Sequence, residues 1–369
     1  MKIAFLITRS DTIGGAQIHV RDLARRLVED GHEPLVITGE AGPYTDALTA
    51  AGVRTLACQH LGREIRPARD ARAFVALRGA IRAFRPDLIS THSSKAGWLG
   101  RLAGKATGVP CLFTAHGWAF THGVREPQRT AYRLLERAAA PLAATIVCVS
   151  EHDRRIGIAA GMAPDQLVTI HNGMLDVCAS LRARSGAGDP VRIAMVARMD
   201  RQKDHDTLLR ALRDIDGVHL DLVGGGPSGA RIRAPAHAVG VADRVRFLGE
   251  RSDVAEVLAR AQIFALISHW EGLPRSTLEA MRAGLPVVVS DVGGAAEAVE
   301  EGVTGYVVPR GDVAAVRERL VVLAGNAARR QEMGVAGRRR YEAAFTFDRM
   351  FQRTFGVYRE ILAGCSAGW

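Results

Sequence analysis

Short apolar runs alternate with helical patterns along most of the chain, and this alternation restricts the fold more than any other feature. In the first half, the predicted strands cover 2–8, 34–38, 53–57, 87–90, 110–114, 144–149 and 167–171. The segments between them have helical periodicity, as in 17–30, where Val20, Leu23, Leu27 and Val28 share one side. Strands that alternate with helices usually pair in parallel, so the sequence predicts a doubly wound α/β sheet.

A second alternating series follows a stretch rich in Ser, Gly, Ala and Arg. Its predicted strands cover 191–197, 218–223, 244–247, 263–267, 286–290 and 305–308. Asn172-Gly173 is a turn pair, and the composition of the residues that follow is typical of a linker. We therefore expect a first domain over 1–172, a linker over 173–190 and a second domain over 191–345.

Length and composition agree with two ordinary domains. A chain of 369 residues with 47% apolar content can bury two full cores. The five cysteines are Cys58, Cys111, Cys148, Cys178 and Cys365. They are scattered without C-x-x-C spacing, which indicates a reducing compartment. Because the run 2–8 is too short for a signal segment and no stretch approaches roughly 20 apolar residues, we expect a cytoplasmic protein.

The net charge of +10 is concentrated in the first domain. Residues 1–172 hold 22 Lys and Arg against 15 Asp and Glu, whereas the rest holds 27 against 24. Seven arginines fall within 63–85, and the apolar residues between them are Phe74, Leu77, Ile81 and Phe84. This pattern predicts a helix with an apolar stripe and a basic face. That face is either simply solvated or contacts an anionic membrane or a diphosphate-bearing acceptor. Nucleic acid is disfavoured because no recognition motif accompanies the charge.

Two glutamates, Glu271 and Glu279, are eight positions apart where the strand 263–267 turns into a helix. Ligands of open α/β sheets bind beyond the carboxyl ends of the strands, so both carboxylates are expected at such a site. Two hydrogen-bond acceptors at different points along one ligand suit a polyhydroxylated molecule such as a sugar nucleotide. In the alternative interpretation, Ser276-x-x-Glu279 is a capping box that closes the start of the helix.

Basic residues occur where helix starts normally favour acids. Arg198 and Lys203 follow the strand 191–197, and Arg275 lies beside the helix predicted over 276–283. A cation at a helix start opposes the macrodipole unless an anion is present, so these residues predict a bound diphosphate. Salt bridges to neighbouring carboxylates are the alternative. The loop Gly224-Gly225-Gly226, after the strand 218–223, is a further backbone that a ligand can approach closely.

The first domain offers two more candidates at strand ends. Gly14-Gly15 follows the first strand and can aim amide groups at a ligand, although a tight turn explains the pair equally well. His116-Gly117 follows the strand 110–114 and is expected to contact substrate, with a structural histidine as the alternative. The run 92–95, His-Ser-Ser-Lys, follows the strand 87–90 and adds hydroxyls and a charge.

No metal site is expected. Asp214-Ile215-Asp216 matches a D-x-D pattern, but it lies between a helix end and a strand start, at the amino edge of the sheet. No His or Cys residues have zinc-site spacing.

Taken together, these motifs resemble a GT-B fold glycosyltransferase of the retaining family 4, over essentially all of the chain. The residues that carry the resemblance are Gly14-Gly15, His116-Gly117, Arg198 with Lys203, Glu271 with Glu279, and the runs 279–288 and 302–309. The resemblance implies two Rossmann-like domains that face each other across a cleft. It also implies that the last helix, within 346–369, crosses back onto the first domain.

The same resemblance assigns roles to single residues. Arg198 and Lys203 would hold the donor diphosphate, Glu279 the ribose and Glu271 the donor sugar. The remaining donor-side and acceptor-side positions are Gly14, Gly15, His116, Gly225, Arg251, and the amides of Gly272 and Leu273. His116 would contact the sugar, and no metal or other cofactor is expected. Pro274-Arg275 replaces the Gly-aliphatic pair common in the family, so the sugar pocket is expected to differ.

The implied activity is retaining transfer of a hexose or N-acetylhexosamine from a nucleotide sugar, with UDP as the expected nucleotide. The runs 92–97 and 116–120 resemble bacterial members that build cell-surface polysaccharide on polyprenyl diphosphate carriers. The acceptor is therefore expected to be a glycan or a lipid-linked sugar. Two alternatives stay open: a UDP-sugar 2-epimerase and a non-catalytic subunit that binds nucleotide sugars.

Overall fold

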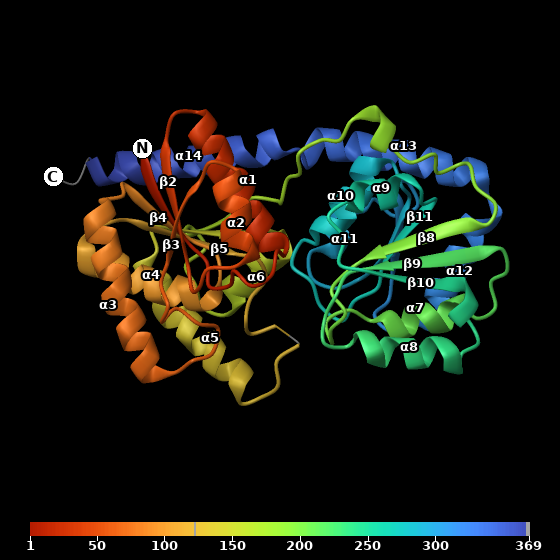
Figure 1. Cartoon of the computed structure of the whole chain (residues 1–369), viewed down its shortest axis with the longest axis horizontal. Helices are drawn as coiled ribbons and strands as arrows, with labels where there is room; N and C mark the ends of the chain where they lie inside the picture. The colour runs from red at the N-terminus through yellow and green to blue at the C-terminus, as the bar shows by residue number, and fades with distance from the viewer. Residues whose placement is uncertain (122, 367–369) are drawn as a thin grey trace. The chain divides into compact units, whose positions relative to one another are not determined.

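Two parallel sheets form where the sequence alternates between apolar runs and helices, and each sheet is the centre of its own unit (Figure 1). The structure, a computed structural model, describes residues 1–121 and 123–366. Unit 1 comprises Met1–His171 together with the chain from Phe351 onward, and unit 2 comprises Asn172–Met350. The predicted α/β class with two Rossmann-like sheets is confirmed.

The unit 1 sheet has seven parallel strands in the order β3-β2-β1-β4-β5-β6-β7. They are β1 (Lys2–Leu6), β2 (Glu33–Thr38), β3 (Arg54–Ala57), β4 (Leu88–Thr91), β5 (Cys111–Ala115), β6 (Thr145–Cys148) and β7 (Leu167–Thr169). The order reverses between β1 and β4, which is the switch point of a doubly wound sheet. Loops that leave β1, β4 and β5 therefore meet at one carboxyl edge.

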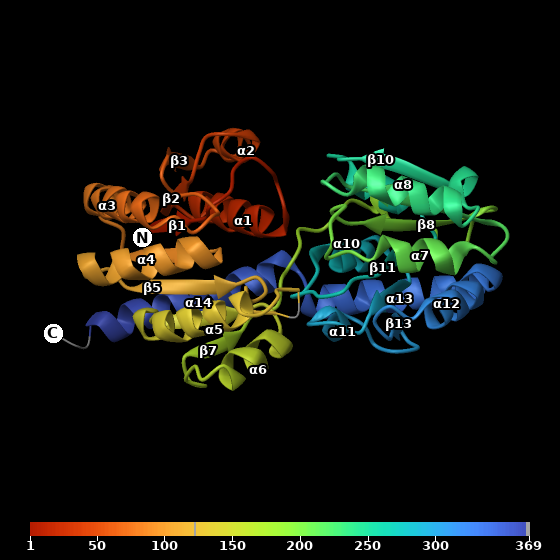
Figure 2. The same cartoon turned by 90° about the horizontal axis from the view of Figure 1, so that it is seen from below.

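Helices cover both faces of this sheet. They are α1 (Gly15–Glu29), α2 (Pro43–Ala50), α3 (Pro67–Phe84), α4 (Ser94–Thr107), α5 (Gln128–Ala139), α6 (Glu151–Ala159) and the short 3-10 turn Ala140–Leu142. Both views show α3 beside α4 (Figures 1 and 2). The α3 helix is the basic segment predicted from the sequence, and it buries Leu77 and Ile81 while its arginines lie outward or partly covered.

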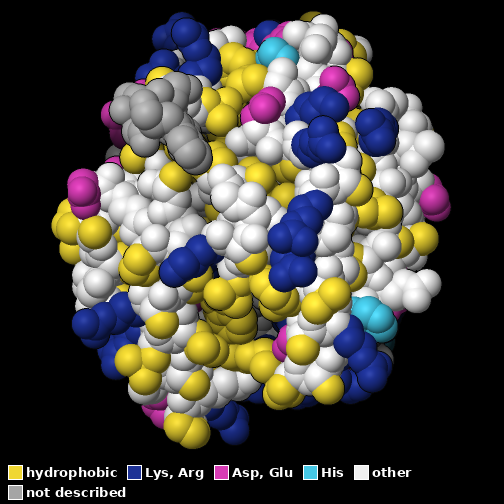
Figure 3. Space-filling model, turned by 90° about the vertical axis from the view of Figure 1, so that its left-hand side faces the viewer, with side chains coloured by type: hydrophobic (Ala, Val, Ile, Leu, Met, Phe, Trp, Pro, Cys, Tyr) yellow, Lys and Arg dark blue, Asp and Glu magenta, His cyan; other side chains and the backbone are white. Residues whose placement is uncertain are grey.

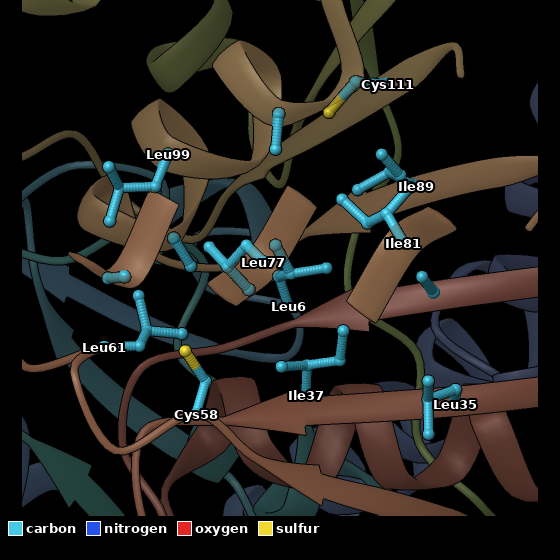
Figure 4. Packing of buried hydrophobic residues seen from close by; sticks show 14 residues of the cluster. Leu6, Leu35, Ile37, Cys58, Leu61, Leu77, Ile81, Ile89, Leu99 and Cys111 are labelled. Atoms are coloured by element: carbon cyan, nitrogen blue, oxygen red, sulfur yellow. The ribbon is translucent and has the colours of Figure 1, made fainter. Parts of the chain in front are cut away.

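The apolar stripe of α3 belongs to a core that strands of the sheet share (Figure 4). Leu77 and Ile81 pack with Leu6 and Ile37 from β1 and β2 and with Leu99 from α4. A fully buried leucine or isoleucine contributes about 1.5–3 kcal/mol relative to an exposed one. The helical spacing of these few residues thus accounts for the face that α3 presents to the sheet.

Most of the described cysteines are small core residues with free thiols. Cys58, Cys111 and Cys148 are buried free thiols, whereas the free thiol Cys178 is exposed. Burial raises the pKa of Cys111 to about 12, so this thiol stays protonated. The Cys365 side chain lies outside the part of the chain whose side chains are described.

The unit 2 sheet has six parallel strands in the order β10-β9-β8-β11-β12-β13. They are β8 (Val191–Val196), β9 (Val218–Val223), β10 (Val245–Gly249), β11 (Ile263–Leu266), β12 (Val287–Ser290) and β13 (Gly305–Val308). The helices are α7 (His205–Leu212), α8 (Gly229–Ala238), α9 (Val254–Ala259), α10 (Arg275–Ala283), α11 (Ala295–Ala298), α12 (Val313–Gly325) and α13 (Ala327–Ala344). Figure 1 shows α7 and α8 on one face of this sheet and α9 and α10 on the other. The switch point lies between β8 and β11.

Residues 173–190, for which the sequence predicts a linker, are hydrogen-bonded to unit 2. The Tyr341 hydroxyl donates to the Met174 carbonyl at 2.9 Å, and the Ala183 amide donates to the Ala283 carbonyl at 2.7 Å. Arg338 forms an ion pair with Asp176. These contacts hold the segment along α10 and α13.

The last helix, α14 (Phe347–Ser366), leaves unit 2 and packs on unit 1 from Phe351 onward. Arg353 donates to the Thr169 carbonyl at 2.7 Å, and the Phe355 ring stacks on His32 at 5.3 Å between centroids. The expected return of the C-terminal helix to the first domain is confirmed. Among the helices that the structure describes, none combines the length and hydropathy needed to cross a membrane.

Candidate active site

The loops after β8 and β11 join at the carboxyl edge of the unit 2 sheet. Lys203 and Ser268 form an antiparallel bridge. The His269 amide donates to the Gln202 carbonyl at 2.8 Å, and the Asp204 amide donates to the Ile267 carbonyl at 2.9 Å. Asp204 then caps α7 by accepting from the Thr207 amide at 3.1 Å. This pairing brings together two segments that are far apart in the sequence.

Glu271 is the centre of the resulting cluster. Its carboxylate forms an ion pair with the Lys203 ammonium, and the two side chains are only 5% and 12% exposed. It also accepts hydrogen bonds from the Ser268 hydroxyl at 2.6 Å and from the Gln202 amide at 3.2 Å. Lys203 therefore lies against Glu271, which is the arrangement expected if both side chains bind the same ligand.

The basic residues of this edge are already paired with carboxylates, as the alternative interpretation predicts. Arg198 forms an ion pair with Asp200 at 2.7 Å, and its side chain is 53% exposed. An exposed pair contributes only about 0–1 kcal/mol, so an incoming anion can easily recruit Arg198. Lys203 is different, because an anion has to bind beside Glu271 or take its place.

Arg275 has a structural role that the sequence interpretation missed. Its side chain is buried, and its guanidinium donates to the Gly173 carbonyl at 3.2 Å. This hydrogen bond occupies one guanidinium nitrogen, and the binding of Arg275 to the same anion as Lys203 stays a prediction. A long side chain at a helix start can reach backward to a carbonyl as readily as forward to a ligand.

Glu279 lies on α10 and is partly exposed. The helix starts at Arg275 with Pro274 as its N-cap and has no side-chain cap hydrogen bond. Ser276 is thus inside the first turn, so the predicted capping box is not formed. The physical reason is Pro274, whose fixed φ and missing N–H place it at the helix start.

The glycines of the loop after β9 approach the protein's own backbone. A Cβ at Gly224 would lie 2.1 Å from the Ala197 carbonyl oxygen, and the Met199 amide donates to the Gly225 carbonyl at 2.8 Å. A Cβ at Gly225 would meet Glu250. These contacts fix the loop that carries Arg198. A contact of Gly225 with a ligand stays a prediction.

The loop that carries Gly272 and Leu273 is held by its carbonyls. The Gly272 carbonyl accepts from the Gly294 amide and the Leu273 carbonyl accepts from Asn172, both at 2.8 Å. Gly293 has φ +59°, and a Cβ there would lie 1.8 Å from the Glu271 carbonyl oxygen, so only glycine fits. The resemblance assigns the two amides, rather than these carbonyls, to the ligand.

Arg251 lies in the loop after β10. It forms a two-point contact with Asp253, with one N–O distance of 2.7 Å, and is exposed. This contact holds the Arg251 guanidinium along its own loop, and its role towards a nucleotide stays a prediction.

In unit 1, Gly14 is the N-cap of α1 and Gly15 is its first residue. The Gly14 amide donates to the Gln17 side chain at 3.2 Å, and the first turn carries no acidic residue. The start of α1 thus keeps its positive end free of carboxylates from its own turn, which suits an anionic or hydroxyl-rich ligand.

Three histidines gather at the carboxyl edge of the unit 1 sheet. His19 is on α1, His92 directly follows β4, and His116 directly follows β5. One nitrogen of His92 (Nδ1) is hydrogen-bonded to Nε2 of His116 at 3.2 Å, and its other nitrogen bonds the Ser90 hydroxyl at 2.9 Å. Burial and the neighbouring His116 hold the pKa of His92 well below its usual value, so the ring is neutral.

In the sequence, His116 and His92 stand out separately as residues at strand ends, whereas His19 does not. The only signal was positional, because all three belong to the strand-to-helix connections at one edge. Lys95 was expected to add charge there, but it is buried and forms an ion pair with Asp70 of α3. The buried Lys95 is thus paired away from the histidines, and of the three rings His92 is held neutral.

Comparison with known families agrees with this geometry. Residues 14–173 match the family described as Glycosyl transferase 4-like domain, and residues 180–340 match Glycosyl transferases group 1. The chain belongs to the family 4 glycosyltransferases of the GT-B fold. The family resemblance read from the motifs is thus confirmed, and so is glycosyltransferase activity as the coarse function.

Two relatives illustrate the range of this glycosyltransferase family. The chain is 29% identical over 297 residues to UDP-Gal:alpha-D-GlcNAc-diphosphoundecaprenol alpha-1,3-galactosyltransferase of Escherichia coli, covering 75% of this chain and 76% of that protein. It is 29% identical over 398 residues to D-inositol 3-phosphate glycosyltransferase of Salinispora tropica, covering 95% and 82%. The acceptors for which these two enzymes are named differ.

Solved structures share the fold. HepE from Anabaena in complex with UDP and glucose superposes with a TM-score of 0.85 at 21% identity, covering 98% of this glycosyltransferase and 100% of that chain. Sucrose-phosphate synthase from Thermosynechococcus elongatus gives a TM-score of 0.86 at 23% identity, covering 98% and 99%. These likenesses establish the GT-B architecture.

Proposed function

We propose that this glycosyltransferase moves a hexose or N-acetylhexosamine from a UDP sugar to a glycan or a polyprenyl-diphosphate-linked acceptor. The proposal includes retention of the anomeric configuration and a role in cell-surface polysaccharide synthesis. The observation that carries the proposal is the buried ion pair of Lys203 with Glu271 at the carboxyl edge of the unit 2 sheet. Lys203 lies in the same loop as Arg198. The relative from Escherichia coli, named for UDP-galactose and a diphosphoundecaprenol acceptor, supports the substrate classes.

The proposal assigns the donor to the loops of unit 2. Arg198 and Lys203 bind the diphosphate, Glu279 accepts from the ribose hydroxyls, and Glu271 accepts from the sugar. The amides of Gly272 and Leu273 complete the donor contacts, and Gly225 and Arg251 lie on the nucleotide side. In unit 1, His116 contacts the transferred sugar, and Gly14-Gly15 contacts the phosphates and the acceptor.

The chemistry is electrostatic. Cleavage of the anomeric C–O bond leaves positive charge on the sugar and negative charge on the diphosphate. Lys203 and Arg198 stabilise the latter, and preorganised groups of this kind contribute about 2.7–4 kcal/mol each. When phosphate oxygens become the partner of Lys203, Glu271 is released to accept sugar hydroxyls. We propose that the reaction uses the donor as substrate and requires no metal.

We propose retention because the family resemblance implies it, and the proposed mechanism uses no dedicated carboxylate pair beside the reacting bond, unlike that of glycosidases. The acceptor oxygen attacks the anomeric carbon from the side that the diphosphate leaves. A departing phosphate oxygen takes the proton of the acceptor hydroxyl. One C–O bond forms as another breaks, and UDP carries away the negative charge.

We further propose peripheral contact with the anionic inner face of the plasma membrane through the segment 63–85. In this segment Val75 is 64% exposed and Ile65 is 49% exposed, beside outward-facing arginines. The face at the left of Figure 1, where α3 lies, carries Lys and Arg in separate groups with apolar side chains between them (Figure 3). Vesicle sedimentation tests this: Arg72→Glu should weaken binding to anionic vesicles, and binding that ignores lipid charge would contradict it.

A panel of nucleotide sugars tests the function. The correct donor should raise the unfolding free energy by about 2.7 kcal/mol at a hundred times its dissociation constant. Transfer is then measured with glycan and lipid-linked acceptors, and the anomeric configuration of the product is read by NMR. Conversion of the donor without any acceptor would favour the epimerase. Stabilisation without turnover on any acceptor would favour the non-catalytic subunit.

A further inference from the structure

The three histidines of unit 1 form a cluster that the proposed transfer does not fully use. Each imidazole offers one ring nitrogen, and the three nitrogens lie within 4.8 Å of one another. The rings of His19 and His116 meet edge to face with centroids 4.8 Å apart. His19 and His92 are buried, whereas His116 is partly exposed and gives the cluster access to solvent.

The spacing is close to that of metal ligands. Two nitrogens that bind one tetrahedral zinc ion at about 2.05 Å lie about 3.3 Å apart. His92 Nδ1 and His116 Nε2 are already 3.2 Å apart. The nitrogen of His19 lies within 4.8 Å of the other two, so His19 is the ring that has to move closer.

The surroundings of His92 also fit a ligand. Metal-binding histidines usually use their second nitrogen for a hydrogen bond that fixes the orientation of the ring. Nε2 of His92 bonds the Ser90 hydroxyl, which in turn bonds the Tyr358 hydroxyl of α14 at 3.2 Å. Phe5 stacks on the same ring at 5.6 Å between centroids. The His92 ring is therefore held from two sides with Nδ1 directed at His116.

We propose that His19, His92 and His116 form a binding site for one divalent transition-metal ion that prefers imidazole, with Zn²⁺ as its representative. Three nitrogen ligands leave a fourth position for water, which suits Zn²⁺ and Co²⁺ but not Mg²⁺, an ion that prefers oxygen. Nδ1 of His92 and Nε2 of His116 share one hydrogen in the metal-free protein, so the ring that carries it has to move it to its other nitrogen before both can bind the metal.

The consequence is inhibition, and this part rests on the proposed function. His116 is the proposed contact to the transferred sugar, and a bound metal occupies its ring nitrogen. Stoichiometric Zn²⁺ should therefore suppress transfer, and a chelator should restore it. Equal concentrations of Mg²⁺ should have no effect.

The direct test is a Co²⁺ titration of the full chain without an affinity tag, in a Cys178→Ser background. That substitution removes the exposed thiol as a competing ligand. One Co²⁺ per chain should bind with the visible absorption of a low-coordinate nitrogen site and without a sulfur charge-transfer band, and Zn²⁺ should displace it.

Two variants and one control decide the site. His19→Ala removes a ligand and should weaken Co²⁺ binding at least tenfold. Ser90→Ala keeps all three ligands and should weaken it roughly 10–100-fold, as loss of an orienting partner does. His237→Ala removes an exposed histidine of unit 2 and should bind like the parent.

Absence of saturable Co²⁺ binding would overturn the proposal, and so would equal affinity in His19→Ala and His237→Ala. His92→Ala removes a further ligand and should also weaken Co²⁺ binding. If this variant fails to fold, the affinities of His19→Ala and Ser90→Ala still test the proposed site. The titration needs no sugar donor, so failure to find glycosyl transfer would leave its outcome unaffected.

Discussion

At the carboxyl edge of the unit 2 sheet, polar side chains meet as charges: Lys203 with Glu271 in a largely buried pair, and Arg198 with Asp200 in an exposed one. At the same edge of the unit 1 sheet they meet as imidazole rings, with His92, which is neutral, hydrogen-bonded to His116. The sheets have the same doubly wound topology at their switch points. What differs is the chemistry that the loops bring to that point.

Under the proposed function, this difference divides the work of transfer between the two sheets. The donor diphosphate would be bound by the cations of unit 2, which are held by carboxylates but can change partner. The sugar hydroxyls would be bound by the imidazoles of unit 1. The two edges should therefore respond differently to loss of a single side chain.

The largest expected effect is on stability, at Glu271. Glu271→Ala leaves Lys203 buried without its carboxylate and should lower the free energy of unfolding by about 3–5 kcal/mol. Glu271→Gln keeps hydrogen bonds and should lose less. Asp200→Asn, in the exposed pair, should change it by less than about 1 kcal/mol. Urea unfolding measures the free energy of unfolding of the three variants. Equal losses in Glu271→Ala and Asp200→Asn would contradict the difference expected between the buried and the exposed ion pair.

The next effect is on nucleotide affinity, at Glu279. Glu279→Gln should weaken UDP binding roughly 10–100-fold, because a hydrogen bond to a charged group contributes about 1.5–3 kcal/mol. Its melting temperature should stay near that of the parent, since Pro274 rather than Ser276 caps α10. Calorimetric titration with UDP reads the first quantity and a thermal scan the second. A loss of stability with unchanged UDP affinity would return Glu279 to a structural role.

A smaller effect, on catalytic efficiency, is expected at His116 in unit 1. His116→Ala removes one neutral hydrogen bond to the sugar, worth about 0.5–1.5 kcal/mol, so kcat/KM should fall roughly 2–10-fold. The affinity for UDP should not change, because UDP lacks the transferred sugar that His116 is proposed to contact. His171→Ala, which removes a histidine outside the cluster, is the matched control. Weaker UDP binding in His116→Ala would contradict the assignment of His116 to the transferred sugar alone.

The smallest expected effect is on the pH dependence of stability, at His205 in unit 2. Burial is the main cause that lowers the pKa of His205, the first residue of α7. A histidine with a lowered folded pKa binds fewer protons than in the unfolded chain, so stability falls as pH decreases below about 6.5. His205→Gln should make this decline shallower, as measured by urea unfolding between pH 7 and pH 5. An unchanged slope would contradict a buried neutral ring at this position.

Features that depend on local periodicity were predictable from the sequence. The strands, the stripe of Leu77 and Ile81 on α3, and the position of Glu271 at a strand end all follow from patterns within a few residues. The partner of Arg275 was not predictable, because the Gly173 carbonyl lies 102 positions away. The grouping of His19 with His92 and His116 likewise needs the strand order, which places three separate connections at one edge. The start of α10 depended on one proline whose position outweighed the Ser276 pattern.

The central claim is that Lys203 binds the donor diphosphate, and comparing UDP with uridine tests it most directly. Calorimetric titrations measure both ligands with the parent and with Lys203→Gln, which keeps a donor for Glu271; Arg201→Gln, an exposed neighbour in the same loop, is the control. The account predicts that UDP binds far more tightly than uridine, and that only Lys203→Gln narrows this ratio, by tenfold or more. An unchanged ratio of UDP to uridine affinity in Lys203→Gln would contradict it.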